Sequence, residues 1–281
     1  MKSTTYFNRS LIVLLMIGIN ISLCAQVQSQ SKAFVPEVGQ DGKDVIWVPT
    51  PDELVSKMME IASVTSKDFL IDLGSGDGRT VIAAAKLGAR AIGIEYNPDM
   101  VELSIKNAEK AGVSDKAKFL QEDLFEFDLS EATVITMFLL PDINLRLRPR
   151  LLDLKPGTRI VSNTFTMGEW DPDFEVTIDE SLNSWYTALM WIIPAKVEGK
   201  WKLEGGELAI RQDFQMIYGT FKSDKKTSTI NTGRLNGNEI TFSIDGATYT
   251  GNVNGKSTIE GKVTTGSGKK DWIATSADSK D

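Results

Sequence analysis

The stretch DLGSGDGR, residues 72–79, holds the residues of this chain that are best suited to bind a small molecule. Glycine at every second position allows a tight turn and lets the backbone approach a ligand closely, because a Cβ atom there would clash. Asp72 stands before the loop and Asp77 within it. In a partly desolvated cleft, these two carboxylates would repel a doubly anionic pyrophosphate. The stretch therefore predicts a site for a neutral or cationic ligand.

A dinucleotide is the first alternative, since Gly74, Gly76 and Glu95 have the spacing of a dinucleotide-binding motif. Arg79 counts against it, because it occupies the position where that motif has its third small residue. S-adenosylmethionine fits better, since it has no phosphate and its sulfonium and ammonium groups are positively charged. We therefore expect S-adenosylmethionine as the ligand.

Three acids follow three consecutive predicted strands. Asp72 can complement the positive charge of the ligand, Glu95 can accept hydrogen bonds from both ribose hydroxyls, and Asp123 can accept one from the adenine amino group. Leu124 offers a backbone amide beside it. Each acid alone has a structural alternative: Asp72 or Asp77 as a helix cap, Glu95 as a surface charge, Asp123 as a turn cap. Their shared place at the carboxyl edge of one sheet, where such folds bind ligands, favours a site.

Strand and helix patterns alternate between residues 51 and 194, which predicts an α/β fold with a parallel sheet covered by helices on both faces. The predicted strands are 68–73, 90–95, 117–121, 132–138 and 158–165. The predicted helices are 51–64, 78–88, 98–112 and 142–154, the last interrupted near Pro149. Residues 174–180 and 185–194 predict a closing antiparallel hairpin, which would make the sheet mixed. Residues 34–51 look like an extended lead-in.

After Pro194 the pattern changes to short alternating runs separated by Gly and Asn pairs, and no helical periodicity interrupts them. This predicts a small antiparallel β-barrel or sandwich over residues 196–281. Aromatic residues at alternating positions are expected to fill its core rather than to line a ligand cage. They are Trp201, Phe214, Phe221, Phe242 and Trp272.

The first 25 residues have the pattern of a secretory signal peptide. Lys2 and Arg9 precede an apolar run over residues 11–25, and the polar stretch QVQSQS follows. The run is shorter than the ~20 residues that a membrane-spanning helix needs. We therefore expect export to the periplasm or cell envelope with cleavage near Ala25. An uncleaved membrane anchor is one alternative. A lipid-modified Cys24 is another, although Leu23 stands where a small residue is expected.

Cys24 is the single cysteine, and the chain contains no histidine. A mature chain beginning after residue 25 would therefore lack disulfides, thiolate nucleophiles and a Ser-His-Asp triad. We expect no metal site, because the commonest metal-binding side chains are missing. The chemistry must rely on carboxylates, amides, hydroxyls, Lys, Arg and the reactivity of the ligand.

The charge is uneven along the chain. Residues 26–195 contain 16 basic and 27 acidic side chains, a net charge of −11, whereas residues 196–281 carry 13 basic and 11 acidic ones. The acidic net charge of residues 26–195 gives no indication of a positively charged surface for a nucleic acid, and it suits a cationic or neutral substrate.

The region from about Ile46 to Ala195 resembles class I S-adenosylmethionine-dependent methyltransferases. VPTP, DLGSGDGRTVIAAAKLGARAIGIE and the stretches DLSEATVITMFLLP and LKPGTRIVSNTF resemble bacterial relatives of the mitochondrial protein-lysine methyltransferases that modify ATP synthase and the adenine nucleotide translocase. The resemblance implies a Rossmann-like seven-stranded sheet with S-adenosylmethionine at Asp72, Gly74, Gly76, Gly78, Glu95 and Asp123. We add to this cofactor site the loop residues Ser75 and Asp77, Leu124, and Thr50 as a gate at its entrance.

The acceptor side is expected after the fourth strand, at Phe138, Leu139, Leu140 and Pro141, with polar contacts from Asn163 and Thr164. A buried strand end is the alternative for the first four. The Asn or Asp that begins the motif of amide and nucleobase methyltransferases is missing there, which disfavours those acceptors. A lysine acceptor would have to be held as a neutral amine by desolvation.

These patterns divide the chain into a signal peptide (1–25), a lead-in (26–44), a methyltransferase domain (45–195) and a β-rich domain (196–281). The favoured function is methylation of an amine, foremost a protein lysine. One alternative is a binding protein whose catalytic ability has decayed. The other is a small-molecule methyltransferase that uses the β-rich domain for docking or dimerisation.

Overall fold

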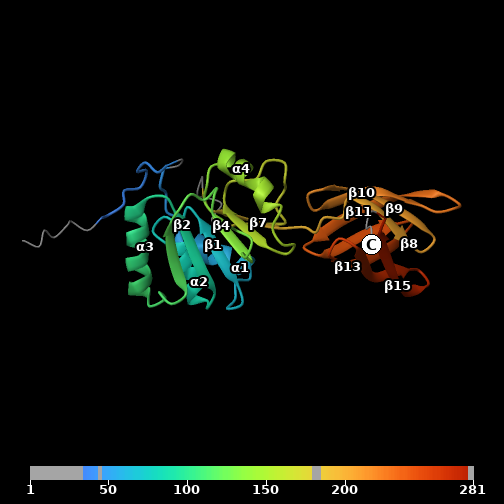
Figure 1. The fold of residues 1–281 in the computed structure, drawn as a ribbon, viewed down its shortest axis with the longest axis horizontal. Helices are drawn as coiled ribbons and strands as arrows, with labels where there is room; N and C mark the ends of the chain where they lie inside the picture. Colours follow the sequence, from blue (N-terminus) through green and yellow to red (C-terminus); the bar gives the residue numbers. More distant parts are fainter. Residues whose placement is uncertain (1–33, 44–45, 179–184, 278–281) are drawn as a thin grey trace, which may run out of the picture. The chain divides into compact units, whose positions relative to one another are not determined.

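The computed structural model describes residues 34–43, 46–178 and 185–277 of the chain (Figure 1). The expected signal peptide and Cys24 lie outside the described residues. None of the helices within these ranges has the length and apolar content of a membrane span.

Seven strands form one mixed sheet in the order β3-β2-β1-β4-β5-β7-β6. Strands β1 to β5 are parallel, and β7 pairs antiparallel with both β5 and β6. The prediction of a mixed sheet closed by a hairpin is thereby confirmed. The strands are β1 (Phe69–Leu73), β2 (Arg90–Glu95), β3 (Ala117–Gln121), β4 (Val134–Met137), β5 (Arg159–Asn163), β6 (Phe174–Thr177) and β7 (Thr187–Ile192).

Helices cover both faces of this sheet, because successive strand residues point to opposite sides. On one face, buried residues of α1 (Asp52–Ile61), α2 (Arg79–Lys86) and α3 (Pro98–Ala111) pack with strand residues such as Leu70 and Val134. On the other face, α4 (Pro141–Leu151) packs with the next residues along the same strands, Ile71 and Ile135. The strand ends that carry the predicted ligand-binding residues are held between these two cores.

Helix α4 differs from the prediction at Pro149. The sequence predicts an interruption there, but the helix is assigned without a break to Leu151. Pro149 lies in the last turn, so the hydrogen bond lost at its nitrogen affects only the end of the helix. Pro141 takes the first helical position, where a fixed φ favours helix initiation.

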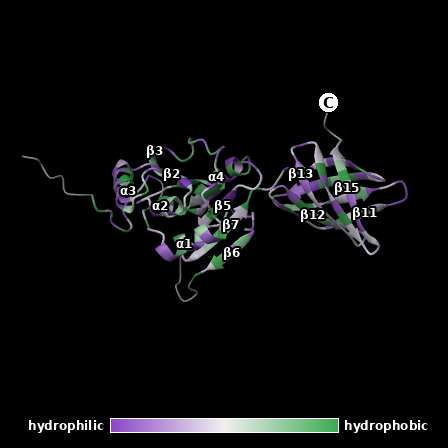
Figure 2. Cartoon of the chain, turned by 90° about the horizontal axis from the view of Figure 1, so that it is seen from below, coloured by the Kyte–Doolittle hydropathy of each residue, from purple (hydrophilic) through white to green (hydrophobic). Residues whose placement is uncertain are grey.

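The C-terminal part is a closed antiparallel barrel of eight strands in the order β10-β11-β12-β13-β14-β15-β8-β9, which decides between the predicted barrel and sandwich. Figure 2 shows the alternation of hydrophobic and hydrophilic residues along these strands. Trp201, Phe242 and Trp272 are buried in the barrel core, and Phe221 packs against it. The strands are β8 (Gly199–Leu203), β9 (Gly206–Asp213), β10 (Met216–Lys222), β11 (Thr227–Asn236), β12 (Glu239–Ile244), β13 (Ala247–Asn254), β14 (Thr258–Thr265) and β15 (Gly268–Ser276).

Phe214 does not belong to the barrel core, contrary to the prediction. It lies in the turn between β9 and β10 at φ 50° and stacks on Trp170 with 5.6 Å between the ring centroids. It is thus packed against the α4 side of the methyltransferase core. Beside it, the side chain of Gln215 accepts from Trp170 Nε1 at 2.8 Å and donates to the Asp171 carbonyl at 2.9 Å. The alternation of buried and exposed residues along a strand ends at a turn, so the sequence pattern could not predict the direction of the Phe214 ring.

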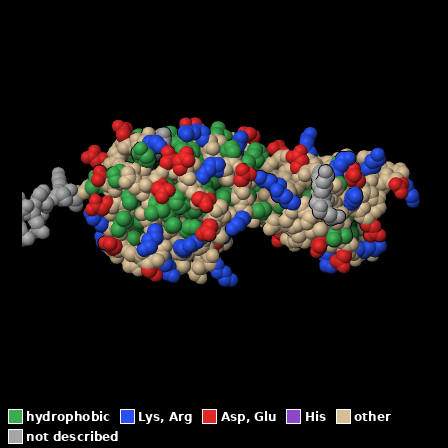
Figure 3. Space-filling model, in the orientation of Figure 1, with side chains coloured by type: hydrophobic (Ala, Val, Ile, Leu, Met, Phe, Trp, Pro, Cys, Tyr) green, Lys and Arg blue, Asp and Glu red, His purple; other side chains and the backbone are tan. Residues whose placement is uncertain are grey.

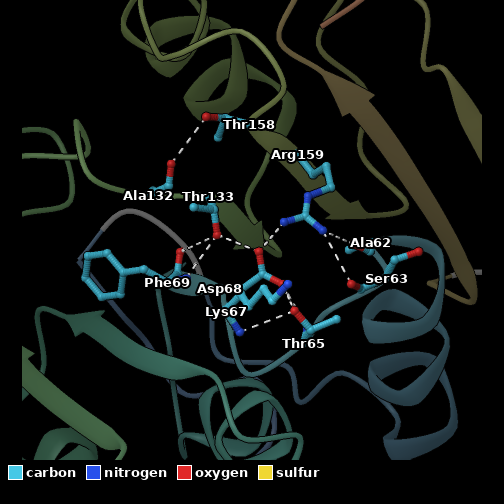
Figure 4. Close-up of polar contacts among 10 residues, drawn as sticks. All are labelled: Ala62, Ser63, Thr65, Lys67, Asp68, Phe69, Ala132, Thr133, Thr158 and Arg159. Carbon is cyan, nitrogen blue, oxygen red and sulfur yellow. Dashed lines mark hydrogen bonds and ion pairs between the residues drawn. The ribbon is translucent and has the colours of Figure 1, made fainter.

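A buried polar network joins the amino-terminal ends of the central parallel strands (Figure 4). Asp68 accepts from Thr133 Oγ1 at 2.7 Å and from the Thr65 backbone at 2.8 Å, and it pairs with Arg159. Arg159 also donates to the carbonyl of Ala62, which caps α1. Burial alone would raise the pKa of Asp68, but these hydrogen bonds and the charge of Arg159 lower it below its ordinary value. The network lies at the edge of the sheet opposite to the predicted ligand site.

Candidate active site

The glycine loop follows β1, and its backbone has a conformation that residues with a side chain rarely adopt. Gly74, Gly76 and Gly78 have φ values of +75°, +54° and +83°. A Cβ atom on Gly76 would lie 2.7 Å from Trp47 Nε1, and one on Gly74 would lie 3.1 Å from Leu139 Cδ2. Helix α3 holds the loop in place, since its Ser104 Oγ donates to the Gly76 carbonyl at 2.7 Å. These glycines therefore permit both the turn and the close approach of other groups.

Gly78 allows the loop to pack closely against Phe119 and Ser104. A Cβ atom there would lie 2.7 Å from the Phe119 ring and 2.9 Å from Ser104 Cβ. We expect Gly78→Ala to lower the free energy of unfolding by about 2–3 kcal/mol, because it adds a clash to an unfavourable φ. Gly112→Ala is the matched control, since Gly112 has a φ of +69° with nothing within 4 Å of its Cβ position. Urea denaturation of both variants measures the difference, and equal losses would contradict a packing role for Gly78.

Asp72 is the buried acid of the site. It is 5% exposed and accepts a hydrogen bond from Thr136 Oγ1 on β4 at 2.6 Å. No Lys or Arg among the described residues forms an ion pair with it. Burial, together with the charges of Glu95 and Asp77, raises the pKa of Asp72 to about 7, although the hydrogen bond from Thr136 acts in the opposite direction. No cationic side chain of the described residues therefore stabilises the ionised form of this carboxylate.

Glu95 ends β2, and backbone amides fix its orientation. Its Oε2 accepts from Gly76 N at 3.0 Å and its Oε1 from Asn97 N at 2.9 Å. Each carboxylate oxygen can accept more than one hydrogen bond, so both can still bind a pair of hydroxyls.

Asp123 follows β3 and lies at the outer side of the site. It accepts from Lys43 Nζ at 2.6 Å and from Phe125 N at 2.9 Å. These bonds, that from Lys43 first, lower the pKa of Asp123. Lys43 Nζ also lies 4.5 Å from the centre of the Tyr96 ring.

Asp77 has its charge compensated, which the sequence did not reveal. Arg79 NH2 pairs with Asp77 Oδ2 at 2.6 Å, and Arg79 NH1 donates to the Thr50 carbonyl at 2.8 Å. The electrostatic argument against a pyrophosphate therefore depends on Asp72 and Glu95.

A cavity of about 200 Å³ brings most of the predicted residues together. On the cofactor side it is lined by Thr50, Asp72, Gly74, Ser75, Gly76, Asp77, Glu95, Asp123 and Leu124, and on the acceptor side by Phe138, Leu139 and Leu140. Gly78, Pro141 and Asn163 lie outside this lining. Asn163 is fully buried, and its amide donates to Thr50 Oγ1 at 3.3 Å. Ser75 Oγ is buried in the cavity wall without a hydrogen-bond partner among the described residues.

Besides Thr50, the segment over residues 34–51, predicted as an extended lead-in, contributes cavity residues that the sequence did not indicate. Trp47 and Lys43 both line the cavity, and a bridge between Asp41 and Ile46 folds this segment back on itself. Gly39 N donates to the Trp47 carbonyl at 2.8 Å, which fixes the turn. The segment is therefore not simply extended. Its glycines at 39 and 42 were the only sequence signal of a turn.

Two further aromatic residues line the acceptor side: Phe165, which follows β5, and Trp185, which precedes β7. Neither was predicted as part of the site. Their distance in sequence from the glycine loop left no motif to connect them with it.

Comparison with known proteins agrees with this geometry. A family model described as the ANTKMT methyltransferase domain matches residues 72–174. The chain is 42% identical over 152 residues to a protein-lysine N-methyltransferase of Saccharolobus islandicus, a match covering 53% of this chain and 94% of that protein. It is 38% identical over 105 residues to the adenine nucleotide translocase lysine N-methyltransferase of Mus musculus, covering 37% of this chain and 46% of that protein. The chain thus spans about half the length of this mouse relative.

A solved structure shares the same fold. It is a crystal structure of an RNA methyltransferase from Salinibacter ruber in complex with S-adenosyl-L-homocysteine. The TM-score is 0.50 and the sequence identity 50%, with 53% of this chain and 96% of that chain covered. S-adenosyl-L-homocysteine is the demethylated form of the ligand that the acidic strand ends predict.

Proposed function

We propose that this chain, which belongs to the S-adenosylmethionine-dependent methyltransferase family that includes the Saccharolobus islandicus protein-lysine N-methyltransferase, methylates the side-chain amine of a lysine in a protein. One observation carries the proposal. A single cavity has on one side a buried carboxylate, Asp72, that forms no ion pair with any described residue, and on the other side aromatic and aliphatic side chains. The first side suits a cationic cofactor, and the second suits the alkyl chain of an amine.

The residues on the carboxylate side fit S-adenosylmethionine. Asp72 lacks a cation, Ser75 Oγ lacks a hydrogen-bond partner among the described residues, and Gly74 and Gly76 leave space that a Cβ atom would fill. When bound, the cofactor supplies an already activated methyl group, so the main task of the protein is positioning. We assign its binding to Thr50, Asp72, Gly74, Ser75, Gly76, Asp77, Glu95, Asp123 and Leu124, with Gly78 supporting the loop.

The acceptor side must favour a neutral amine. A free lysine side chain has a pKa of about 10.4, and removal of water by Phe138, Leu139 and Leu140 lowers it. The proton on the acceptor nitrogen would pass to water before transfer. The nitrogen lone pair would then form the new N–C bond as the S–C bond of the sulfonium breaks, and the electron pair of that bond would stay on the sulfur of the departing S-adenosyl-L-homocysteine. The product leaves as a methylated ammonium, so no basic side chain is required. We assign Phe138 and Leu140 to contact with the acceptor, and Pro141 and Asn163 to holding the two acceptor segments in place.

Two relatives differ in their acceptors, since one is a protein-lysine and the other an RNA methyltransferase. The net charge of −11 over residues 26–195 favours the protein acceptor, because an RNA would be repelled. On the face drawn in Figure 3, acidic and basic side chains of the sheet-bearing part are interspersed, without a continuous basic patch. We further propose that residues 1–25 direct export, so that the acceptor is a protein of the periplasm or cell envelope.

Methyl transfer is tested directly by incubating residues 26–281 with a cell-envelope extract and methyl-labelled S-adenosylmethionine, followed by peptide mapping. We expect label on lysine side chains. Label confined to RNA or to small molecules would overturn the lysine assignment. Absence of cofactor binding in a calorimetric titration at millimolar ligand would instead indicate a scaffold that has lost catalysis.

A further inference from the structure

Three aromatic rings on the acceptor side form one continuous cluster. The rings of Phe138 and Phe165 stack with centroids 5.9 Å apart and an interplanar angle of 22°. Trp185 meets Phe138 edge to face at 6.2 Å and 65°. All three line the cavity, and Trp185 is 40% exposed. We call Phe138, Phe165 and Trp185 the aromatic wall.

The backbone holds Phe165 of this wall in a fixed place. The preceding residue, Thr164, has a φ of 62°, and the Phe165 carbonyl accepts from Ser162 Oγ at 2.8 Å and from the buried amide of Asn144 at 3.2 Å. Trp185 has a φ of 67°. Left-handed backbone at residues other than glycine is unfavourable and is concentrated at functional sites, where the surrounding structure enforces it. The position of these rings is therefore determined by more than the packing of apolar surface.

Within the described part of the chain, no Lys or Arg side chain lies over the faces of the aromatic wall. Among the described residues, Lys or Arg side chains lie over the rings of Phe69, Tyr96, Phe125, Phe214 and Tyr218, and none lies over the wall. The wall also carries no hydroxyl group, so it offers π faces rather than a hydrogen-bond acceptor. A π face attracts an ammonium group, and the attraction increases when the group is desolvated.

The charge of the cavity favours a cation too. Six carboxylates line it, and its two basic side chains, Lys43 and Arg79, each form an ion pair with one of them. The carboxylates are Asp41, Asp72, Asp77, Glu95, Glu122 and Asp123. A long aliphatic chain that ends in an amine therefore meets both an apolar surface and a favourable potential.

We infer that Phe165 and Trp185, together with Phe138, form the subsite that binds the acceptor as an alkylammonium before its proton passes to water, and again as the methylated ammonium after methyl transfer. This inference rests on the proposed function, because it identifies the class of acceptor by its chemistry. The wall retains its attraction for an alkylammonium as methyl groups replace N–H bonds, since π faces do not depend on hydrogen-bond donors.

The wall is tested with two probes that have the same shape but differ in charge. Nε-trimethyllysine amide and its neutral isostere, in which carbon replaces the quaternary nitrogen, are titrated into residues 26–281 saturated with S-adenosyl-L-homocysteine. We expect the cationic probe to bind about tenfold more tightly than the neutral one. In Phe165→Leu and Trp185→Leu this preference should fall below about twofold, because leucine keeps an apolar surface but lacks the ring.

Phe174→Leu is the matched control, because Phe174 lies on β6, is 58% exposed and does not line the cavity. It should keep the preference, and all three variants should bind S-adenosyl-L-homocysteine like the unaltered protein. Equal binding of both probes by the unaltered protein would overturn the inference, as would a preference that survives loss of the rings. Lysine methylation with unaltered KM in Phe165→Leu and Trp185→Leu would overturn it while leaving the proposed function intact. Lack of any methyl transfer by the unaltered protein would instead count against the proposed function.

Discussion

Asp72→Asn is expected to weaken S-adenosylmethionine binding at least about 100-fold and, at the same time, to stabilise the cofactor-free protein above pH 7. The loss of binding follows because asparagine cannot neutralise a cation in a buried site. The gain in stability follows from the same burial, which raises the pKa of Asp72 to about 7 despite the hydrogen bond from Thr136. Ionised Asp72 destabilises the empty fold, and asparagine removes that charge.

The pH window of the stability effect follows from the two pKa values. The pKa of Asp72 is about 7 in the folded protein and about 3.9 in an unfolded chain. The stabilising contribution of Asp72 is therefore complete below about pH 4 and is lost as the pH rises to 7, about 4 kcal/mol in full. The advantage of Asp72→Asn in free energy of unfolding should grow across this window and stay constant above pH 7. Cofactor affinity of the unaltered protein should decrease below pH 7, because binding must then displace a proton.

Calorimetric titration and urea denaturation at pH 5 and pH 8 measure both effects. Asp115→Asn is the control, since Asp115 is exposed and lies outside the cavity lining. Cofactor affinity within threefold of the unaltered protein would refute the role of Asp72. An unchanged stability at pH 8 would refute the explanation by burial.

Asp68→Ala is expected to lower the free energy of unfolding by about 3–5 kcal/mol at pH 7, because it leaves Arg159 partly buried without its carboxylate. Since hydrogen bonds and Arg159 lower the pKa of Asp68, its stabilisation is present above pH ~4 and is lost as the pH falls further. The difference between the variant and the unaltered protein should therefore shrink in acid. Urea denaturation at pH 7 and at pH 3 checks both the size and the direction of the effect.

The surface pair of Arg90 and Glu131 gives the matched control for this ion pair. Its atoms are 3.4 Å apart, and its side chains are 63% and 71% exposed. Glu131→Ala should cost less than about 1 kcal/mol. Asp68→Ala should also leave cofactor affinity unchanged, since the network lies at the opposite edge of the sheet. Equal costs for the two variants would contradict the importance of burial at Asp68.

The sheet could be predicted because each strand has its own local signal. Short apolar runs such as residues 69–73 and 134–137 alternate with helical patterns, and their parallel pairing follows from the helices between them. The carboxylates at the ends of β1, β2 and β3 line one cavity for the same reason, since parallel strands end at a common edge. The prediction of an interruption at Pro149 was wrong, because proline disrupts a helix less when it lies in the last turn.

Residues brought to the site by long-range folding could not be predicted. Trp47 approaches the glycine loop only because a turn at Gly39 folds the lead-in back, and Phe165 and Trp185 meet Phe138 only after β5 and β7 pair. The compensation of Asp77 by Arg79 depends on side-chain conformations that sequence spacing does not fix. Asn163 shows the converse: its place at a strand end suggested a contact with the acceptor, but its side chain is buried against Thr50.

Phe214 and Gln215, which follow β9 of the barrel, contact Trp170 of the sheet-bearing part. Trp170 is fully buried, and part of its cover is a turn that belongs to the barrel. A catalytic portion without the barrel would expose that indole and leave its N–H without an acceptor. The turn between β9 and β10 therefore belongs to the interior of the catalytic fold, and the barrel cannot be removed without uncovering Trp170.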